Sequence, residues 1–237
     1  MAVILNIETS TNVCSVALTL DGYILFHCED FNGPNHAAIL SDFIFDALKY
    51  IDEHDNMQLN AISISLGPGS YTGLRIGLSE AKGLAYGLRV PLIGINTLKI
   101  LGVSAMFRLH DFNPDDDLLI PMIDARRNEV YTMVLDGSLN EIAAPHALIL
   151  NDDSLNFLKS DQKRLVFVGN GAEKARNLIS FSKSTDTLFL PDISPVATDM
   201  CPLSEQKYIN SDFIDLAYSV PFYIKDFQAT QPKNKIL

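Results

Sequence analysis

The residues best suited to chemistry gather in the stretch from Gly67 to Gly73, GPGSYTG, between an apolar run and a helical pattern. A glycine-rich turn between a strand and a helix can cradle a phosphate, because the free N–H groups and the helix dipole favour an anion. A dinucleotide fingerprint would need glycine in place of Thr72, and a Walker A loop would need lysine in place of Leu74. The spacing therefore favours a tight turn, with anion binding near Gly69, Ser70 and Thr72 as a secondary hypothesis.

The turn IETST near the N-terminus is a second candidate for nucleotide chemistry. It is similar to the phosphate-binding hairpin of an actin-like ATPase, but such hairpins usually carry aspartate and then glycine, where this chain has Glu8 and Ser10. Glu8 could hold a cation through water. The interpretation that we favour is a partly buried acid whose oxygens accept hydrogen bonds from turn amides.

Neither a metal centre nor a nucleophile is predicted by the remaining reactive residues. No two histidines stand three or four residues apart, H-E-x-x-H is absent, and no serine has a G-x-S-x-G context. A pairing of Cys14 with a histidine stays open, although Cys14 is expected to be a buried strand residue. Asp124, Arg126, Arg127 and Glu129 form the densest charged cluster, for which a salt-bridged hairpin turn is at least as good an interpretation as a ligand site. We expect no catalytic residue, no metal and no cofactor.

The helix predicted over residues 74–88 has an unusual stripe beside its core face, made of Ile76, Glu80, Gly83 and Gly87. Glycine inside a helix costs roughly 1 kcal/mol relative to alanine. Several glycines in one helix therefore need a reason, and close approach of another backbone supplies one. That backbone could belong to a partner or to the same chain.

The helix predicted within residues 33–51, with Asn35 as the candidate N-cap, also has surplus apolar surface. Ile39, Phe43 and Tyr50 widen its apolar stripe beyond the ~100° that a core-facing helix needs. The core face itself is predicted to hold Ala37, Leu40, Ile44, Ala47, Leu48 and Ile51. Two neighbouring helices of this kind predict a contact with a second chain.

These helices belong to a chain in which strands come first and later alternate with helices, which is typical of an α/β protein with mixed sheets. Up to three strands are expected within residues 2–29, with a hairpin turn at Asp21-Gly22. Further strands are expected over residues 60–67, 90–96, 118–125, 128–137, 164–169 and 187–190. Further helices are expected over residues 97–109, 153–160, 171–181 and 196–209, the last broken into short pieces by Pro202.

The polar segment HDFNPDDD, near residues 104–117, is the expected lobe boundary. It would divide the chain into an N-terminal lobe of residues 1–104, which carries the two docking helices, and a C-terminal lobe of residues 105–237. The last residues would either pack back or be mobile. The order β-β-β-α-β-α in the first lobe is the order of a ribonuclease H-like fold.

Composition and charge restrict the function further. The chain has 237 residues with 47% hydrophobic and 20% charged residues, so a sizeable core is expected. Its formal net charge of −11 makes unaided nucleic-acid binding improbable. Three scattered cysteines fit reduced thiols of a cytoplasmic protein rather than a disulfide framework. Neither a signal peptide nor a membrane span is expected.

Four blocks taken together resemble the bacterial TsaB (YeaZ) family. They are ILNIETSTNVCSVAL, SLGPGSYTGLRIGLSEAKGLAYGL, PMIDARRNEVY and the final VPFYIK, and they stand in the family's order over most of the chain. The chain departs from the family pattern at Glu8, where aspartate is usual, and at Ile224-Lys225, where Leu-Arg is usual. Lysine keeps the charge of arginine but lacks its bidentate fork.

The resemblance implies a two-lobed actin-like ATPase, ribonuclease H-like fold with mixed sheets flanked by helices. It implies an accessory scaffold role in making threonylcarbamoyladenosine next to the anticodon of tRNAs that read codons beginning with A. The catalytic subunit would be the paralogue TsaD, which holds a metal through two histidines, and TsaE would be an ATPase that joins them. A homodimer would form when the chain is alone, and tRNA would be contacted only indirectly.

Two other functions remain as alternatives to this scaffold role. One is an actin-like phosphotransferase or hydrolase that uses Glu8 and the turn from Gly67 to Gly73 to bind a nucleotide. The weaker one is a metallopeptidase, because the wider family once carried a glycoprotease label. Neither has its own motif in the sequence.

Overall fold

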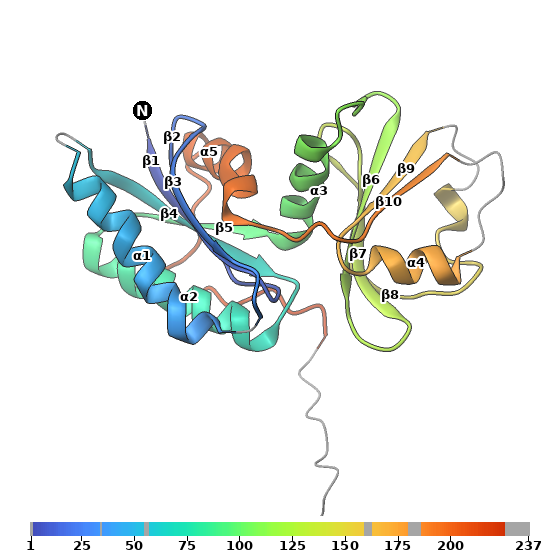
Figure 1. Ribbon diagram of the computed structural model, residues 1–237, viewed down its shortest axis with the longest axis horizontal. Helices are drawn as coiled ribbons and strands as arrows, with labels where there is room; N and C mark the ends of the chain where they lie inside the picture. The colour runs from blue at the N-terminus through green and yellow to red at the C-terminus, as the bar shows by residue number, and fades with distance from the viewer. Residues whose placement is uncertain (1, 34, 55–56, 159–162, 180–185, 226–237) are drawn as a thin grey trace, which may run out of the picture.

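The first five strands form one mixed sheet, which the computed structural model shows in the left half of Figure 1. The structure describes residues 2–33, 35–54, 57–158, 163–179 and 186–225. The strands of this sheet are β1 (Val3–Glu8), β2 (Cys14–Leu20), β3 (Tyr23–Asp30), β4 (Leu59–Gly67) and β5 (Leu92–Asn96). They lie in the order β3-β2-β1-β4-β5, with β1 antiparallel to β2 and parallel to β4. The tight turn between β2 and β3 has positive φ at Asp21 and Gly22, as the hairpin prediction requires.

A second sheet repeats this topology in the right half of Figure 1. Its strands are β6 (Asp117–Asp124), β7 (Glu129–Leu135), β8 (Glu141–Ile149), β9 (Arg164–Val168) and β10 (Thr187–Leu190), in the order β10-β9-β6-β7-β8. Strand β6 is antiparallel to β7 and parallel to β9, so it has the role that β1 has in the first sheet. The predicted fold class, an α/β fold of mixed sheets flanked by helices, is confirmed.

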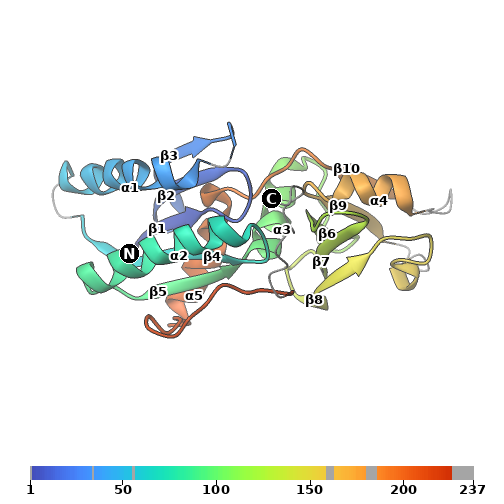
Figure 2. The same cartoon turned by 90° about the horizontal axis from the view of Figure 1, so that it is seen from below.

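Helices cover the sheets where apolar residues recur at helical spacing. Helices α1 (His36–Asp52) and α2 (Tyr71–Leu88) lie side by side on one face of the first sheet (Figures 1 and 2). Their buried residues share a core with alternate residues of the strands, including Leu5, Ile7 and Ile64. Helix α4 (Ala172–Leu178) and a short 3-10 turn (Asn156–Leu158) pack on the second sheet. None of the helices within the described residues is both long and apolar enough to cross a membrane.

Helix α3 (Thr97–Arg108) lies between the two sheets (Figure 1). Ile100 and Val103 join a core on the first sheet, whereas Leu98 and Leu101 join a core on the second. The chain later returns to the first sheet through a 3-10 turn (Ala197–Met200) and α5 (Cys201–Ile209). The lobe division at residue 104, which falls inside α3, stays a prediction; the structure adds that residues 197–209 pack on the first sheet.

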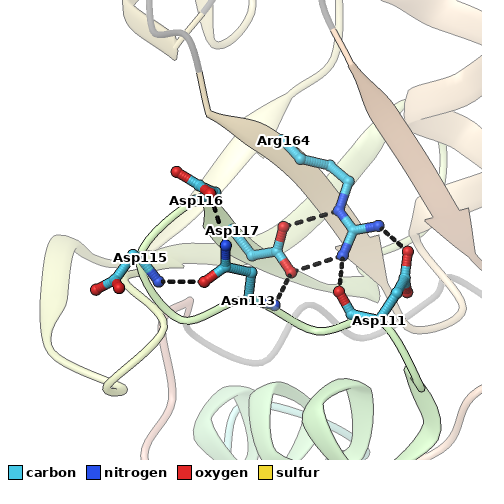
Figure 3. A network of polar contacts seen from close by, with 6 residues as sticks. All are labelled: Asp111, Asn113, Asp115, Asp116, Asp117 and Arg164. Carbon is cyan, nitrogen blue, oxygen red and sulfur yellow. Dashed lines mark hydrogen bonds and ion pairs between the residues drawn. The ribbon is translucent and has the colours of Figure 1, made fainter.

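The polar segment between α3 and β6 is tied to the second sheet by Arg164 of β9 (Figure 3). The Arg164 guanidinium donates from Nε to Asp117 Oδ1 at 2.7 Å and from Nη2 to Asp117 Oδ2 at 2.7 Å. It also reaches Asp111 Oδ2 from Nη1 at 2.6 Å. Such a bidentate contact to a nearly buried carboxylate is the geometry in which arginine binds best. The polar segment that the sequence predicts as a lobe boundary is therefore fixed where it enters the second sheet.

The structure differs from the sequence predictions at strand β8 and at the start of α1. The sequence does not predict strand β8, which is a half-exposed edge strand whose apolar and polar residues do not alternate regularly. It also contains Pro145, and proline has no N–H group to donate to a neighbouring strand. Asn35 is the N-cap position of α1, but its side chain donates to Asp30 Oδ2 instead of capping the helix. Ala37 is exposed, and the buried residue in that first turn is His36, whose Nε2 lies 3.1 Å from the Val13 carbonyl oxygen.

Candidate functional site

The glycine-rich turn after β4 packs directly against the turn between β1 and β2. A Cβ atom on Gly69 would clash with the backbone carbonyl of Ser10, and one on Gly73 would clash with the backbone carbonyl of Thr9. One turn further along α2, a Cβ on Gly77 would clash with the side chain of Thr9. Close approach of a second segment of the same chain thus explains three glycines without a ligand.

Two backbone N–H groups at the start of α2 have partners within the chain. The Ser70 N–H donates to the carbonyl oxygen of Ser10 at 2.6 Å, and the Ser70 hydroxyl accepts from the N–H of Gly73 at 3.2 Å. This N-cap begins the helix at Tyr71, three residues earlier than the predicted start at Leu74. Of the residues predicted to lie near an anion, Ser70 and Thr72 are exposed and Gly69 is half-buried.

Glu8 and Ser10 lie on the other side of this contact and are completely buried. Glu8 accepts the Ser10 N–H through Oε1 at 2.9 Å. Burial raises the pKa of Glu8 to about 7, although the backbone N–H groups of the turn act in the opposite direction. A buried carboxyl group that is half protonated near pH 7 is a weaker cation ligand than an exposed carboxylate. Of the five candidate residues for nucleotide chemistry, Glu8, Ser10, Gly69 and Ser70 are therefore brought together in packed turns, whereas Thr72 is exposed.

The open question about Cys14 is resolved by its surroundings. It is a buried residue of β2, and burial together with the charges of Glu8 and Asp30 raises its pKa to about 12. A thiol with that pKa has almost no thiolate at neutral pH, and the thiolate is the nucleophile. Among the described residues, no group of three or more His, Cys, Asp or Glu side chains is arranged to hold a metal ion.

The outer side of α1 and α2 presents small and aromatic residues. A Cβ built on Gly83 or Gly87 would meet nothing within 4 Å, and both glycines are exposed. Packing within the chain therefore does not explain these two glycines, in contrast to Gly77. Phe45 of α1 is 66% exposed and Tyr86 of α2 is 78% exposed. We call Phe45, Gly83, Tyr86 and Gly87 the α1–α2 face.

The predicted docking stripe of α1 faces the other way, toward β3. The ring of Tyr50 lies 6.0 Å from that of Phe26 on β3 and stacks on His54 at 4.1 Å. Ile39 and Phe43 share this side at helical spacing, and all three side chains are half-buried against the first core. They are thus partly packed within the chain, and their part in docking stays a prediction.

The predicted stripe of α2 is divided in the same manner. Ile76 is half-buried against the first core, and Glu80 accepts a hydrogen bond from the Ser41 hydroxyl of α1 at 2.9 Å. Within this stripe, only Gly83 and Gly87 are exposed. Sequence reasoning singled out neither Phe45 nor Tyr86 as an interface residue. Both could have been found as large apolar side chains outside the buried arc of their helix.

A segment near the C-terminus borders the α1–α2 face. Lys82 of α2 donates to the carbonyl oxygens of Ala217 at 3.1 Å and Ser219 at 2.7 Å. Arg75 donates from Nε to the hydroxyl oxygen of Tyr223 at 3.0 Å. The segment leaves Tyr218 85% exposed beside the helix. These long-range contacts carry no signal in the sequence, because they join residues more than 130 positions apart.

Comparison with known proteins finds relatives over nearly the whole chain. The family sequence model described as "TsaD: tRNA N6-adenosine threonylcarbamoyltransferase" matches residues 32–233. The chain is 29% identical over 229 residues to the Escherichia coli "tRNA threonylcarbamoyladenosine biosynthesis protein TsaB", covering 94% of each chain. It is 29% identical over 178 residues to the protein of the same description from Bacillus subtilis, covering 74% of each.

Solved structures agree on the fold. The structure described as "YeaZ from Pseudomonas aeruginosa" superposes with a TM-score of 0.79 at 23% identity, covering 94% of this chain and 100% of that one. A second Pseudomonas aeruginosa structure, described as a protein with similarity to peptidase YeaZ, has the same TM-score and identity.

Proposed function

Because this chain belongs to the tRNA N6-adenosine threonylcarbamoyltransferase (TsaD) family, and within it to the TsaB (YeaZ) proteins, we propose that it takes part in tRNA threonylcarbamoyladenosine biosynthesis as an accessory scaffold subunit. In this role it binds and activates the catalytic paralogue of the TsaD type. It contributes no catalytic group of its own.

The observation that carries the proposal is the open α1–α2 face. Gly83 and Gly87 leave empty space above α2, in which the backbone of a partner helix can approach closely. Phe45 and Tyr86 add large apolar side chains beside that space. Aromatic side chains are enriched among the residues that contribute most to binding at protein interfaces. The corresponding helices of a TsaD-type paralogue are the partner that we propose.

The absence of a catalytic role is supported by the two places where chemistry was expected. The turn from Gly67 to Gly73 is filled by the carbonyls of Thr9 and Ser10, and Glu8 is buried with a raised pKa. The same observations count against the nucleotide-dependent phosphotransferase. Isothermal calorimetry with ATP and magnesium tests this point, because tight binding that Glu8→Ala abolishes would favour the enzyme instead.

Two further partners belong to the proposal. A TsaE-type ATPase joins the assembled pair, and the catalytic subunit supplies most of the contacts to tRNA. In the absence of a partner, the α1–α2 face of one chain covers that of a second copy. A symmetric homodimer of this kind uses the same patch twice.

Co-purification with a tagged TsaD-type subunit tests the docking surface. Gly83→Leu fills the space above α2 and Tyr86→Asp puts a charge beside it, so each should reduce complex formation at least tenfold. Phe43→Asp is unsuitable, because Phe43 packs against the core. Phe107→Asp is a matched control, since Phe107 is 62% exposed on α3, away from this face.

Undiminished complex formation by folded Gly83→Leu and Tyr86→Asp variants would reject the surface. The scaffold role itself is tested by reconstituting tRNA modification with and without this chain. Full activity of the TsaD-type and TsaE-type proteins alone would reject it.

A further inference from the structure

The turn between β6 and β7 carries two adjacent arginines that the docking role does not use. Arg126 and Arg127 are exposed, and both have left-handed backbone, with φ of 68° and 50°. Such positions normally go to glycine, asparagine or aspartate, and a left-handed conformation costs other residues roughly 1–2 kcal/mol each. The turn therefore keeps two arginines at a cost in backbone energy.

The carboxylates nearest to these arginines are already paired with lysines. Asp124 Oδ1 accepts from Lys174 Nζ of α4 at 2.6 Å, and Glu129 Oε1 accepts from Lys225 Nζ. The salt-bridged turn expected from the sequence exists, but lysines from distant segments make the bridges. In the part of the chain that the structure describes, neither arginine side chain has a hydrogen bond or an ion pair.

The turn is also held rigidly. Lys174 Nζ donates to the carbonyl oxygen of Arg127 at 2.6 Å, and Asp124 Oδ1 accepts the backbone N–H of Arg126 at 2.6 Å. The N–H of Asp124 donates to Asn170 Oδ1 at 2.8 Å. The two guanidinium groups thus project from a fixed hairpin end, with a local excess of positive charge from Arg126, Arg127, Lys174 and Lys225 over Asp124 and Glu129.

We propose that Arg126 and Arg127 contact phosphates of the tRNA substrate when this chain is assembled with its catalytic partner. The proposal rests on the proposed function, because it takes tRNA as the substrate of the assembly. A guanidinium fork matches two phosphate oxygens, and paired adjacent forks suit a ligand with repeated phosphates. The net charge of −11 disfavours RNA contact over much of the remaining surface. The sequence predicts that tRNA is contacted only indirectly. The proposal adds one direct contact, at the β6–β7 turn.

The test measures tRNA affinity of the assembled complex at several salt concentrations. The double variant Arg126→Gly with Arg127→Asn removes both charges with residues that tolerate left-handed backbone, so the hairpin should be retained. The affinity should fall roughly tenfold or more. The slope of log affinity against log salt should become shallower by about 1 for each arginine.

Arg89→Asn is the matched control. Arg89 is also an exposed arginine with left-handed backbone, φ 56°, and it too has no side-chain partner among the described residues. It lies at the end of α2, away from the β6–β7 turn, and its replacement should leave tRNA affinity unchanged.

Assembly is measured on the same samples by size-exclusion chromatography. Unchanged tRNA affinity of an assembled double variant would overturn the proposal, as would an equal loss in Arg89→Asn. Loss of assembly in the double variant would also overturn it, because the arginines would then bind an acidic surface of a protein partner. Failure of the wild-type chain to assemble at all would instead reject the proposed function.

Discussion

At the scale of single residues, the buried carboxyl group of Glu8 lowers the free energy of unfolding at neutral pH. Its pKa is about 7 in the folded chain and near the ordinary value of 4.5 in the unfolded chain. Between these two pH values the folded state keeps a proton that the unfolded state has lost. The free energy of unfolding therefore falls as pH rises from about 4.5 to 7, and remains lower above that range. At about 1.4 kcal/mol for each pKa unit, the difference is on the order of 3 kcal/mol.

Glu8→Gln should remove this cost, because glutamine is close in shape to the protonated acid. We expect the variant to match the wild type at pH 4.5 and to be more stable by about 2–3 kcal/mol at pH 8. Urea unfolding of both chains across this range measures the difference. Glu53→Gln, at an exposed acid at the end of α1, is the matched control for removing one carboxylate. A difference for Glu8→Gln that does not change with pH would contradict the raised pKa.

At the scale of elements, α2 uses glycine for two separate purposes. Gly73 and Gly77 allow the β1–β2 turn to approach, whereas Gly83 and Gly87 leave the outer side open. The second sheet repeats the first arrangement, because Gly169 and Gly171 after β9 pack against Met122 of β6. In both halves, the loop after the fourth strand needs glycines because the end of the first strand lies against it.

Alanine substitutions should separate the two kinds of glycine. Gly77→Ala should destabilise the chain by about 1–3 kcal/mol, because its Cβ would overlap Thr9. Gly83→Ala should stabilise it by about 0.5–1 kcal/mol, because the site is open and alanine is the better helix former. Denaturant unfolding of the isolated chain measures both. Destabilisation by Gly83→Ala would mean that the space above α2 is filled in the isolated chain.

At the scale of the whole molecule, α3 and the segment that returns along α2 connect the two sheets. Helix α3 contributes to a core on each side, and Lys225 at the end of the described C-terminal segment pairs with Glu129 of β7. The α1–α2 face lies on the outside of the first sheet, on the side opposite α5 (Figure 1). A partner can therefore cover this face without separating the two sheets.

The isolated chain should accordingly be a dimer through the α1–α2 face. Gly83→Leu and Tyr86→Asp should shift it to monomer, while Phe107→Asp should leave the dimer intact. Analytical ultracentrifugation over a concentration series measures the equilibrium. A dimer that both face variants leave undisturbed would place the contact elsewhere on the molecule.

The sequence by itself determined the elements with clear periodicity or turn chemistry. The Asp21-Gly22 hairpin, the strands of the first sheet and the buried arc of α1 through Leu40, Ile44, Ala47 and Ile51 follow from local pattern. The family blocks followed from the same sequence, whereas the repeated strand order of the two sheets came only from the structure. Edge strand β8 was not predicted from the sequence. An edge strand is only half-buried, so its apolar and polar residues need not alternate.

Only the tertiary structure decided which side of each helix is free. Gly77 and Gly83 have the same residue type in the same helix, but Thr9 lies against one and nothing lies against the other. Tyr50 and Phe45 are both aromatic residues of α1, yet Phe26 of β3 covers the first while the second is exposed. Local spacing cannot separate these cases, because the neighbours that bury a side chain come from distant parts of the chain.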